Sequence, residues 1–122
     1  MNFPENLQYT KTHEWVRVLG DGIVEIGLSD YAQGELGDLV FVNLPKPGDS
    51  LKQGAVFADV ESVKAVSDIY SPLNGTVKEV NQELLDSPEL INSSPYSSWL
   101  IRAEGALPGG LLSAAEYKAL FK

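Results

Sequence analysis

The sequence predicts a mostly β protein, folded as a sandwich or flattened barrel with short helices and a C-terminal helix. Segments that alternate apolar and polar residues recur between turn residues, at the spacing of roughly 8–12 residues that is typical of such folds. Two of them, "DGIVEI" at 21–26 and "NGTVKEV" at 74–80, each follow an Asx-Gly turn, which suits two similar halves. We expect a single domain over 1–122, with its core at about 7–104 and the terminal helix at about 113–121.

The N-terminal part of the chain is expected to form three strands and one short helix. "GDG" at 20–22 is a strong hairpin turn between the first two strands. Ser29 suits the N-cap of a helix over 29–36, and Gly37 suits its C-terminal end. The prolines and glycine of "PKPGD", at 45–49, force a turn after the third strand. The expected strands are 14–19, 22–28 and 39–44.

The rest of the chain is expected to add four strands and two helices. "SPLNG" at 71–75 indicates a turn. "SPEL" at 87–90 begins with a serine suited to an N-cap and a proline suited to the first helical position, so we expect a short helix there. Ser113 and Glu116 have the spacing of a capping box at the start of a helix over 113–121. The expected strands are 55–61, 65–70, 76–80 and 98–104.

The composition excludes several classes of function. A formal charge of −8 and a pI near 4.5 argue against nucleic-acid binding, because phosphates attract clustered Lys and Arg. The chain has no cysteine and one histidine, His13, so Cys/His zinc sites, thiolate nucleophiles and CxxC redox motifs are excluded. The longest apolar runs, such as "LVFV", are four residues, too short to span a membrane. We expect a cytoplasmic bacterial protein, or the mature form of a mitochondrial matrix protein.

The segment "VESVKAVSD", at 60–68, places one lysine among small and branched residues. Its near-symmetry about Val63 and Lys64 predicts a hairpin with these two residues at the tip. The bend holds no Gly, Asn or Pro, so turn chemistry alone does not predict it. A lysine at a tight tip is exposed and rigidly placed for a modifying enzyme. The local pattern is also that of an ordinary surface lysine, and by itself it favours that interpretation.

The segment "ESVKAVSDIYSPLNG" resembles the lipoylation segment of the glycine cleavage system H protein family. The likeness covers about residues 7–121 and includes "INSSPY" and the pattern "GD-VFV-LP-PG". The context Val63-Lys64-Ala65 favours this family over biotinyl domains, with their MKM context, and over the DKA context of oxo-acid dehydrogenase domains. The matching stretches are "YTKTHEWVRV" (9–18), "VEIGLSDYAQGELGDLVFVNLPKPGD" (24–49), "VNQELLDSPELINSSPY" (80–96) and "LLSAAEYKAL" (111–120).

The resemblance implies a fold and a cofactor. The family fold is the hybrid of two antiparallel sheets that lipoyl and biotinyl carrier domains share. The implied cofactor is lipoic acid, bound covalently as N6-lipoyllysine at Lys64. The implied protein is a non-catalytic carrier, because the cofactor supplies the chemistry.

The resemblance also implies partners. They are the pyridoxal-phosphate-dependent glycine decarboxylase (P protein), the tetrahydrofolate-dependent aminomethyltransferase (T protein), dihydrolipoamide dehydrogenase (L protein), and a lipoyl ligase or lipoyl/octanoyl transferase. We expect a monomer that binds neither nucleic acid nor membrane. Two alternatives remain: a donor of lipoyl groups to 2-oxoacid dehydrogenases in lipoate relay, and an unmodified binding module that retains the fold.

Four further residues are candidates for the site. In the family the loaded arm folds into a surface cleft, and the matching positions here are Thr12, Glu14 and Asp68. A carboxylate there could hold the amine of the loaded group by a charge-assisted hydrogen bond. Glu61 and Asp68 are also candidates for recognition by the lipoyl-attaching enzyme. The alternatives are a solvated acid at a strand edge for Glu14, and acids that keep the tip soluble for Glu61 and Asp68.

The other singled-out residues are expected to be structural. His13 is expected to be structural or on the surface rather than a base, and Trp15 and Trp99 are expected to be core anchors. The sequence departs from the family pattern after the lysine. The segment "PYSSW" at 95–99 is shorter than usual, and the segment "EGALPGG" at 104–110 is short and rich in glycine. These departures bear on partner docking more than on lipoylation, and they leave room for the relay alternative.

Overall fold

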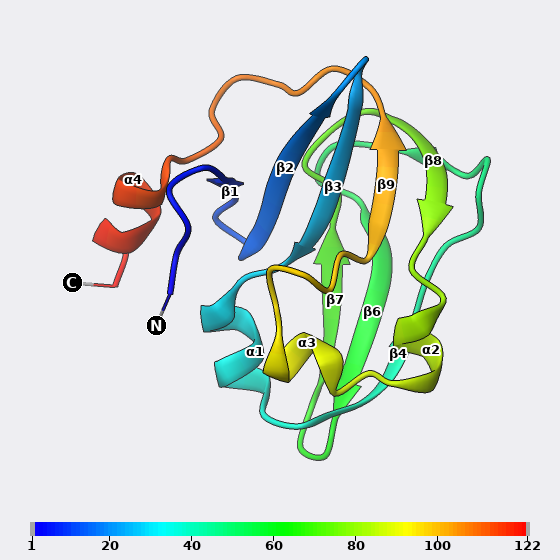
Figure 1. Cartoon of the computed structure of the whole chain (residues 1–122), viewed down its shortest axis with the longest axis vertical. Coiled ribbons are helices and arrows are strands. Elements are labelled where there is room, and N and C mark those ends of the chain that lie inside the picture. The colour runs from blue at the N-terminus through cyan, green and yellow to red at the C-terminus, as the bar shows by residue number, and fades with distance from the viewer. Residues whose placement is uncertain (1, 122) are drawn as a thin grey trace.

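The protein is built from two antiparallel sheets that pack face to face. The structure, a computed structural model, describes residues 2–121. A six-stranded sheet has the order β1-β2-β3-β9-β8-β5, and a three-stranded sheet has the order β4-β6-β7. Figure 1 shows the smaller sheet behind the larger one, with the β6–β7 hairpin at the lower end of the molecule. The predicted mostly β fold of two antiparallel sheets is therefore confirmed.

The helices are short and lie outside the two sheets. They are α1 Asp30–Leu36, α2 Glu83–Asp86, α3 Leu90–Ser93 and α4 Ala114–Ala119. The strands are β1 Gln8–Tyr9, β2 Glu14–Gly20, β3 Ile23–Leu28, β4 Leu39–Asn43, β5 Ser50–Leu51, β6 Val56–Ser62, β7 Val66–Tyr70, β8 Gly75–Val80 and β9 Ile101–Glu104. None of the helices described within residues 2–121 has the length and apolar character needed to cross a bilayer.

The main core fills the space between the two sheets. Because alternate residues of a strand point to the same face, each strand turns one set of branched side chains inward. Ile26 and Ile101 come from the larger sheet, and Val60 and Ile69 come from the smaller one; all four are at most 1% exposed. Burying each such side chain stabilises the fold by roughly 1.5–3 kcal/mol. This core fixes the two sheets relative to each other.

A second core joins the two ends of the chain to the edge of the larger sheet. It is an aromatic cluster in which Tyr9 and Tyr117 stack with ring centroids 4.7 Å apart. The backbone of Tyr9 exchanges two hydrogen bonds with that of Leu112, each 2.8 Å long. The capping box of Ser113 and Glu116 is present at the start of α4, as predicted. The terminal helix is therefore packed against the sheet, although it spans 114–119 rather than 113–121.

Two predicted elements begin three residues later than the sequence suggested. The helix expected at 87–90 begins at Leu90, because the backbone N–H of Ser87 bonds the carbonyl of Glu83 and so ends an unpredicted helix, α2. The strand expected at 98–104 begins at Ile101, since the backbone N–H of Ser98 bonds the carbonyl of Ser94 instead of a neighbouring strand. The two-residue strands β1 and β5 were also not predicted, because so short a segment shows no alternation.

Candidate functional site

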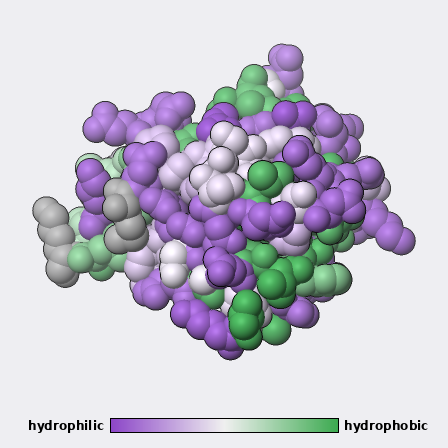
Figure 2. Space-filling model, turned by 60° about the horizontal axis from the view of Figure 1, so that its bottom comes forward, coloured by the Kyte–Doolittle hydropathy of each residue, from purple (hydrophilic) through white to green (hydrophobic). Residues whose placement is uncertain are grey.

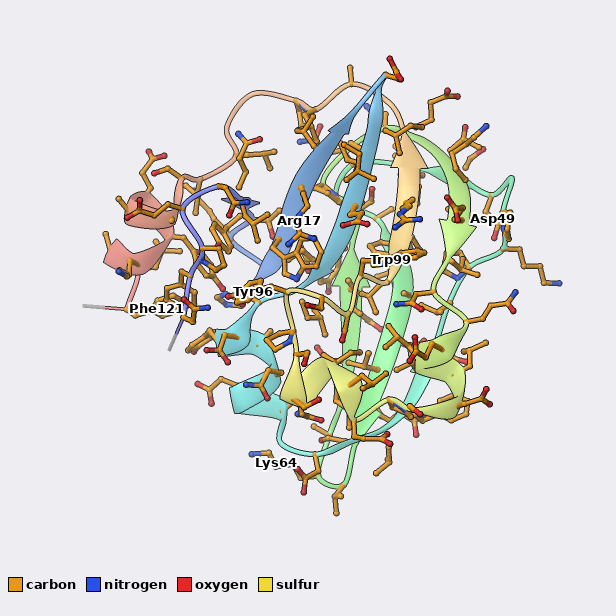
Figure 3. The ribbon with its side chains drawn as sticks, viewed as in Figure 1. Arg17, Asp49, Lys64, Tyr96, Trp99 and Phe121 are labelled. Atoms are coloured by element: carbon orange, nitrogen blue, oxygen red, sulfur yellow. The ribbon has the colours of Figure 1, made fainter. Side chains whose placement is uncertain are left out.

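Lys64 lies at the tip of the β6–β7 hairpin. The strands pair antiparallel with Glu61 opposite Val66, a register centred between Val63 and Lys64. The backbone N–H of Ser62 bonds the carbonyl of Ala65 at 2.8 Å and closes the tip. Lys64 is exposed, and Figure 3 shows it at the lower end of the molecule. The predicted hairpin and its two-residue tip are confirmed.

The side chain of Ser62 accounts for a turn that lacks the usual turn residues. Its Oγ accepts hydrogen bonds from the backbone N–H of Lys64 at 3.3 Å and of Ala65 at 3.1 Å. Serine hydroxyls bond backbone groups two or three residues further on, which makes serine a turn former in the absence of Gly or Asn. The sequence interpretation missed this role of Ser62, although a serine two residues before the lysine was the available signal.

The end of α1 supports the tip from one side. The backbone N–H of Val63 bonds the carbonyl of Asp38 at 3.4 Å. Gly37 ends α1 with φ of 80°, and a Cβ placed there would lie 3.6 Å from Cε of Lys64. A glycine is favoured at this position because other residues rarely adopt positive φ. The stem of Lys64 therefore lies against the backbone that follows α1.

Asn92, from the "INSSPY" segment, fastens the loop that supports the tip. Its amide N–H₂ donates to the carbonyl of Gly37 at 2.9 Å and to the side-chain oxygen of Gln33 at 3.0 Å. Its amide oxygen accepts from the backbone N–H of Leu39 at 2.9 Å. One side chain thus joins α3, α1 and the start of β4. The sequence interpretation did not predict this contact, which depends on residues more than fifty positions apart.

Two neighbouring hollows lie beside the free edge of β7. The larger has a volume of about 400 Å³, and Thr12, Glu14 and Tyr70 are among the residues that line it. The smaller has a volume of about 130 Å³ and is lined by Thr12, Leu36 and Asp68, among others. Thr12 lines both, and Leu36 directly precedes the glycine that contacts the Lys64 stem. The hollows therefore extend from the region of the hairpin towards Glu14.

Glu14 is a buried carboxylate with one well-bonded oxygen. It is 1% exposed. Its Oε1 accepts hydrogen bonds from the hydroxyls of Thr10 at 2.6 Å and Thr12 at 2.5 Å, whereas Oε2 has only a long contact of 3.5 Å with the N–H of Tyr70. The ion pairs formed among residues 2–121 do not include it. Burial raises the pKa of Glu14, and its hydrogen bonds partly offset this effect. A cationic group in the larger hollow would supply the missing counter-charge.

The structure separates Glu61 from the other candidate residues. Thr12, Glu14 and Asp68 lie along the two hollows, whereas Glu61 lines neither. Glu61 lies on β6, opposite Phe41 on one side and Val66 on the other. The first three residues are therefore placed along the hollows, whereas Glu61 shares the outer face of the smaller sheet with Asp68 but lines neither hollow.

His13 and Trp15 occupy structural positions. His13 Nδ1 lies 2.8 Å from the hydroxyl of Tyr117, and desolvation lowers the pKa of His13. Trp15 is fully buried and its indole N–H bonds the carbonyl of Pro95 at 3.0 Å. Trp99 is half-buried: one part of it packs against the aromatic core, as expected of an anchor, and the guanidinium of Arg102 lies over its ring, 4.2 Å from the centroid.

The fold and the tip together define a class of protein. A sandwich of two antiparallel sheets that presents one lysine at the tip of a hairpin is the architecture of lipoyl and biotinyl carrier domains. The residues on either side of Lys64 are valine and alanine. This context separates the chain from the biotinyl members of the class, which have methionines there.

Comparisons with known proteins identify the family. The family model described as Glycine cleavage H-protein matches residues 7–122. The glycine cleavage system H protein of Nitratidesulfovibrio vulgaris is 54% identical over 122 residues, covering 98% of this chain and 95% of that protein. The one from Herpetosiphon aurantiacus is 54% identical over 119 residues, covering 96% and 92%. The chain belongs to the glycine cleavage H-protein family.

A solved structure supports the same assignment. The crystal structure of a glycine cleavage system H protein from Mycobacterium marinum matches with a TM-score of 0.93 and 38% sequence identity. The match covers 98% of both chains. The fold of the family is therefore present along nearly the whole length of this chain.

Proposed function

We propose that this chain is the lipoyl carrier of a glycine cleavage system and that Lys64 is its attachment residue. The observation that carries the proposal is the position of Lys64, exposed at a hairpin tip that Ser62 and the end of α1 hold in place. The lipoyl group supplies a disulfide that takes up an aminomethyl group and returns as a dithiol. The chain itself positions the arm and shelters its end, and we propose no catalytic residue in it.

Attachment requires only the side-chain nitrogen of Lys64. In the proposed reaction the Lys64 ammonium first gives up one proton, and the neutral Nζ then attacks the carbonyl carbon of an acyl-adenylate and forms an amide bond. The bond between that carbon and the phosphate oxygen breaks, AMP leaves, and the nitrogen releases a proton to solvent. A lipoyl/octanoyl transferase would use a thioester, from which a thiol leaves. Either route replaces the positive charge of Lys64 by a neutral amide.

The partners in the proposed cycle are three enzymes and the attaching enzyme. Glycine decarboxylase loads the arm, the tetrahydrofolate-dependent aminomethyltransferase unloads it, and dihydrolipoamide dehydrogenase reoxidises it. Tethering gives the arm a high local concentration in each docked active site. The family membership supports these partners. We also propose that residues 1–122 act as one monomeric domain.

The two hollows are proposed to hold the loaded end of the arm. Thr10 and Thr12 fix Oε1 of Glu14, which leaves Oε2 available for the amine of the aminomethyl group. A buried carboxylate without a counter-charge binds an ammonium by a charge-assisted hydrogen bond. Thr12 and Asp68 would contact the arm along the smaller hollow. In this position the labile group is kept from bulk water.

A second candidate function is that of a lipoyl donor to 2-oxoacid dehydrogenases. It is favoured by the short "PYSSW" segment at 95–99, which departs from the family pattern. The structure places this segment on the outer side of the larger sheet, where the carbonyl of Tyr96 accepts a hydrogen bond from Arg17 at 2.9 Å. Both candidates share Lys64 as the attachment residue.

Reconstitution distinguishes the candidates. The chain, lipoylated by a ligase, is mixed with the P, T and L proteins, and glycine-dependent exchange of labelled CO₂ is measured. The proposal predicts exchange that requires Lys64 and is lost in Lys64→Arg. Normal lipoylation without exchange, together with lipoyl transfer to a dehydrogenase domain, would instead support the relay function. A chain that a ligase never modifies would support an unmodified binding module.

A further inference from the structure

The segment 10–14 is a tight turn that carries both hydroxyls bonded to Glu14. The backbone N–H of Thr10 bonds the carbonyl of Glu14 at 3.0 Å, and the N–H of His13 bonds the carbonyl of Thr10 at 3.1 Å. The hydroxyl oxygens of Thr10 and Thr12 lie 3.2 Å apart, and both donate to Oε1 of Glu14. We call residues 10–14 the threonine turn. The position of the carboxylate therefore depends on the shape of this turn.

His13 has an unfavourable backbone conformation within the threonine turn. Its φ is 76°, in the left-handed region that residues other than glycine rarely adopt. Such a residue persists where its surroundings impose the conformation. The carbonyl of His13 accepts a hydrogen bond from the N–H of Ser29 at 3.0 Å, and Nδ1 of its ring lies 2.8 Å from the hydroxyl of Tyr117. His13 is therefore held through both its backbone and its ring.

Tyr117, from α4, connects the threonine turn to α1. Its hydroxyl lies 2.7 Å from Oγ of Ser29 as well as 2.8 Å from the ring of His13. The same Oγ accepts from the N–H of Ala32 and so caps α1. Burial raises the pKa of Tyr117, and the negative charge of Glu14 also acts to raise it. The Tyr117 hydroxyl therefore stays protonated and lies within electrostatic reach of the carboxylate.

Tyr117 does not itself contact the hollows. It is 0% exposed and lines neither hollow, whereas His13 lines the smaller one. Figure 1 shows α4 beside β1, away from the hairpin that carries Lys64. The face drawn in Figure 2 is largely hydrophilic, in keeping with an aromatic cluster that is turned inward. Any effect of the Tyr117 hydroxyl on a group bound in the hollows must therefore pass through other residues.

We propose that Tyr117 is a positioning residue for Glu14, an inference that rests on the proposed binding of the amine by that carboxylate. The Tyr117 hydroxyl holds the ring of His13, and His13 holds the threonine turn in its strained shape. The turn then directs the hydroxyls of Thr10 and Thr12 to Oε1 and leaves Oε2 for the amine. The terminal helix is therefore part of the site, although 104 positions separate Tyr117 from His13.

The first test compares two tyrosines of the same aromatic cluster. Tyr117→Phe keeps the ring that stacks on Tyr9 but removes the hydroxyl. Release of ammonia from the aminomethyl-loaded arm should become about fivefold faster, as for the loss of one hydrogen bond. The matched control is Tyr9→Phe, which removes a hydroxyl bonded to the carbonyl of Pro4 at 2.7 Å. A general loss of stability affects both variants alike, so the control should release ammonia at the rate of the unaltered chain.

The second test measures the pKa of Glu14 directly in the unmodified chain. The ¹³C chemical shift of its carboxyl carbon is followed by NMR across a pH series. Hydrogen bonds from Thr10 and Thr12 lower the pKa of Glu14 against the effect of burial, so their loss in Tyr117→Phe should raise this pKa further. Tyr9→Phe should leave it unchanged. Both variants keep the other ionisable residues that line the larger hollow, which are Lys11 and Tyr70.

A double variant tests the route through His13. His13→Asn removes the ring but tolerates the positive φ, and it should raise the pKa of Glu14 as Tyr117→Phe does. Because both substitutions break the same connection, the double variant should raise the pKa no further. A further rise in the double variant would overturn the route through His13.

The two readouts separate this inference from the proposed function. An equal pKa of Glu14 in Tyr117→Phe and Tyr9→Phe, or equal rates of ammonia release in these two variants, would overturn the positioning role of Tyr117. A normal rate of release in Glu14→Gln, together with a raised pKa of Glu14 in Tyr117→Phe, would instead overturn the binding of the amine by Glu14. In that case the connection from Tyr117 to the carboxylate would still stand.

Discussion

The backbone N–H of Lys64 is hydrogen-bonded to Oγ of Ser62, 3.3 Å away, in a tip that contains neither Gly nor Asn. The same oxygen accepts from Ala65, so one buried hydroxyl supplies the acceptor for two consecutive backbone donors. The lysine is therefore held by its neighbour two residues earlier, and the turn does not depend on positive φ.

Ser62→Ala is expected to loosen the tip, because two backbone N–H groups lose their acceptor. The expected cost is about 1–3 kcal/mol in the free energy of unfolding, measured by denaturant titration. The rate at which a lipoyl ligase modifies Lys64 should fall as well. Ser62→Thr keeps the hydroxyl and should restore both properties. Ser93→Ala, which removes one exposed hydrogen bond, is the control and should leave both unchanged. A normal modification rate in Ser62→Ala would show that the hydroxyl does not position the lysine.

Gly37→Ala and Gly34→Ala are expected to change stability in opposite directions. Gly37 has φ of 80°, so alanine there is strained and should cost more than about 1 kcal/mol. Gly34 lies within α1 with open space around it, so alanine should stabilise the helix by roughly 0.5–1 kcal/mol. Thermal unfolding of the two variants measures both changes in stability. Stabilisation by both substitutions would contradict the strained end of α1.

Glu14→Gln should make stability less sensitive to pH. Burial raises the pKa of Glu14 above its usual 4.5 in the folded protein, so the native state binds this proton more tightly than the unfolded chain. The stabilisation from Glu14 is therefore present below pH 4.5 and is lost as the pH rises through the raised pKa. Relative to the unaltered chain, Glu14→Gln should gain stability over that interval. Urea titrations at a series of pH values measure the difference. A difference that does not change with pH would contradict a buried, unpaired carboxylate.

Loaded with an aminomethyl group, the Glu14→Gln variant should fail to protect it. The neutral glutamine amide cannot offer a negative charge to the amine, so release of ammonia from the loaded arm should be faster than in the unaltered chain. The control is Glu25→Gln, because Glu25 is buried but pairs with Arg17 and Arg102 away from the hollows. Equal rates of release in the unaltered chain and Glu14→Gln would remove the proposed role of the carboxylate.

His13 is expected to couple the docking of α4 to pH. Desolvation lowers its pKa from the usual 6.5, whereas the charge of Glu35 acts in the opposite sense. The depressed pKa means that stability from neutral His13 is present above pH 6.5 and is lost as the pH falls through the folded-state value. Amide exchange in α4 should therefore speed up on acidification. His13→Asn should abolish this change, since asparagine tolerates the φ of 76° found at this position. An unchanged exchange profile in His13→Asn would assign the effect to other groups.

The alternating strands and the hairpin register could be predicted from the sequence because both follow from local patterns. The symmetry of the residues around Val63 and Lys64 reappears as the pairing of Glu61 with Val66. The contacts that support the tip could not be predicted in this way. Asn92 bonds Gly37 across 55 positions, and its amide shows no local pattern that distinguishes it from a surface asparagine.

The burial of Glu14 was likewise beyond sequence reasoning. In β2 it precedes two buried residues, Trp15 and Val16, so alternation gives no indication of which face it takes. Its surroundings come from Thr10, Thr12 and the distant backbone of Tyr70. Trp99 was predicted only in part, because it packs against the aromatic core but is half-buried. Strand β9 begins only at Ile101, so Trp99 lies outside it, with Arg102 over the exposed side of its ring.

The central claim, that Lys64 is the residue that carries the lipoyl group, is tested most directly by mass spectrometry of the chain after coexpression with a lipoyl ligase. We predict that the intact mass rises by one lipoyl group, that Lys64→Arg abolishes the rise, and that Lys78→Arg, at an exposed lysine on β8, leaves it unchanged. An unchanged mass in the unaltered chain, or a rise that persists in Lys64→Arg, would contradict the claim.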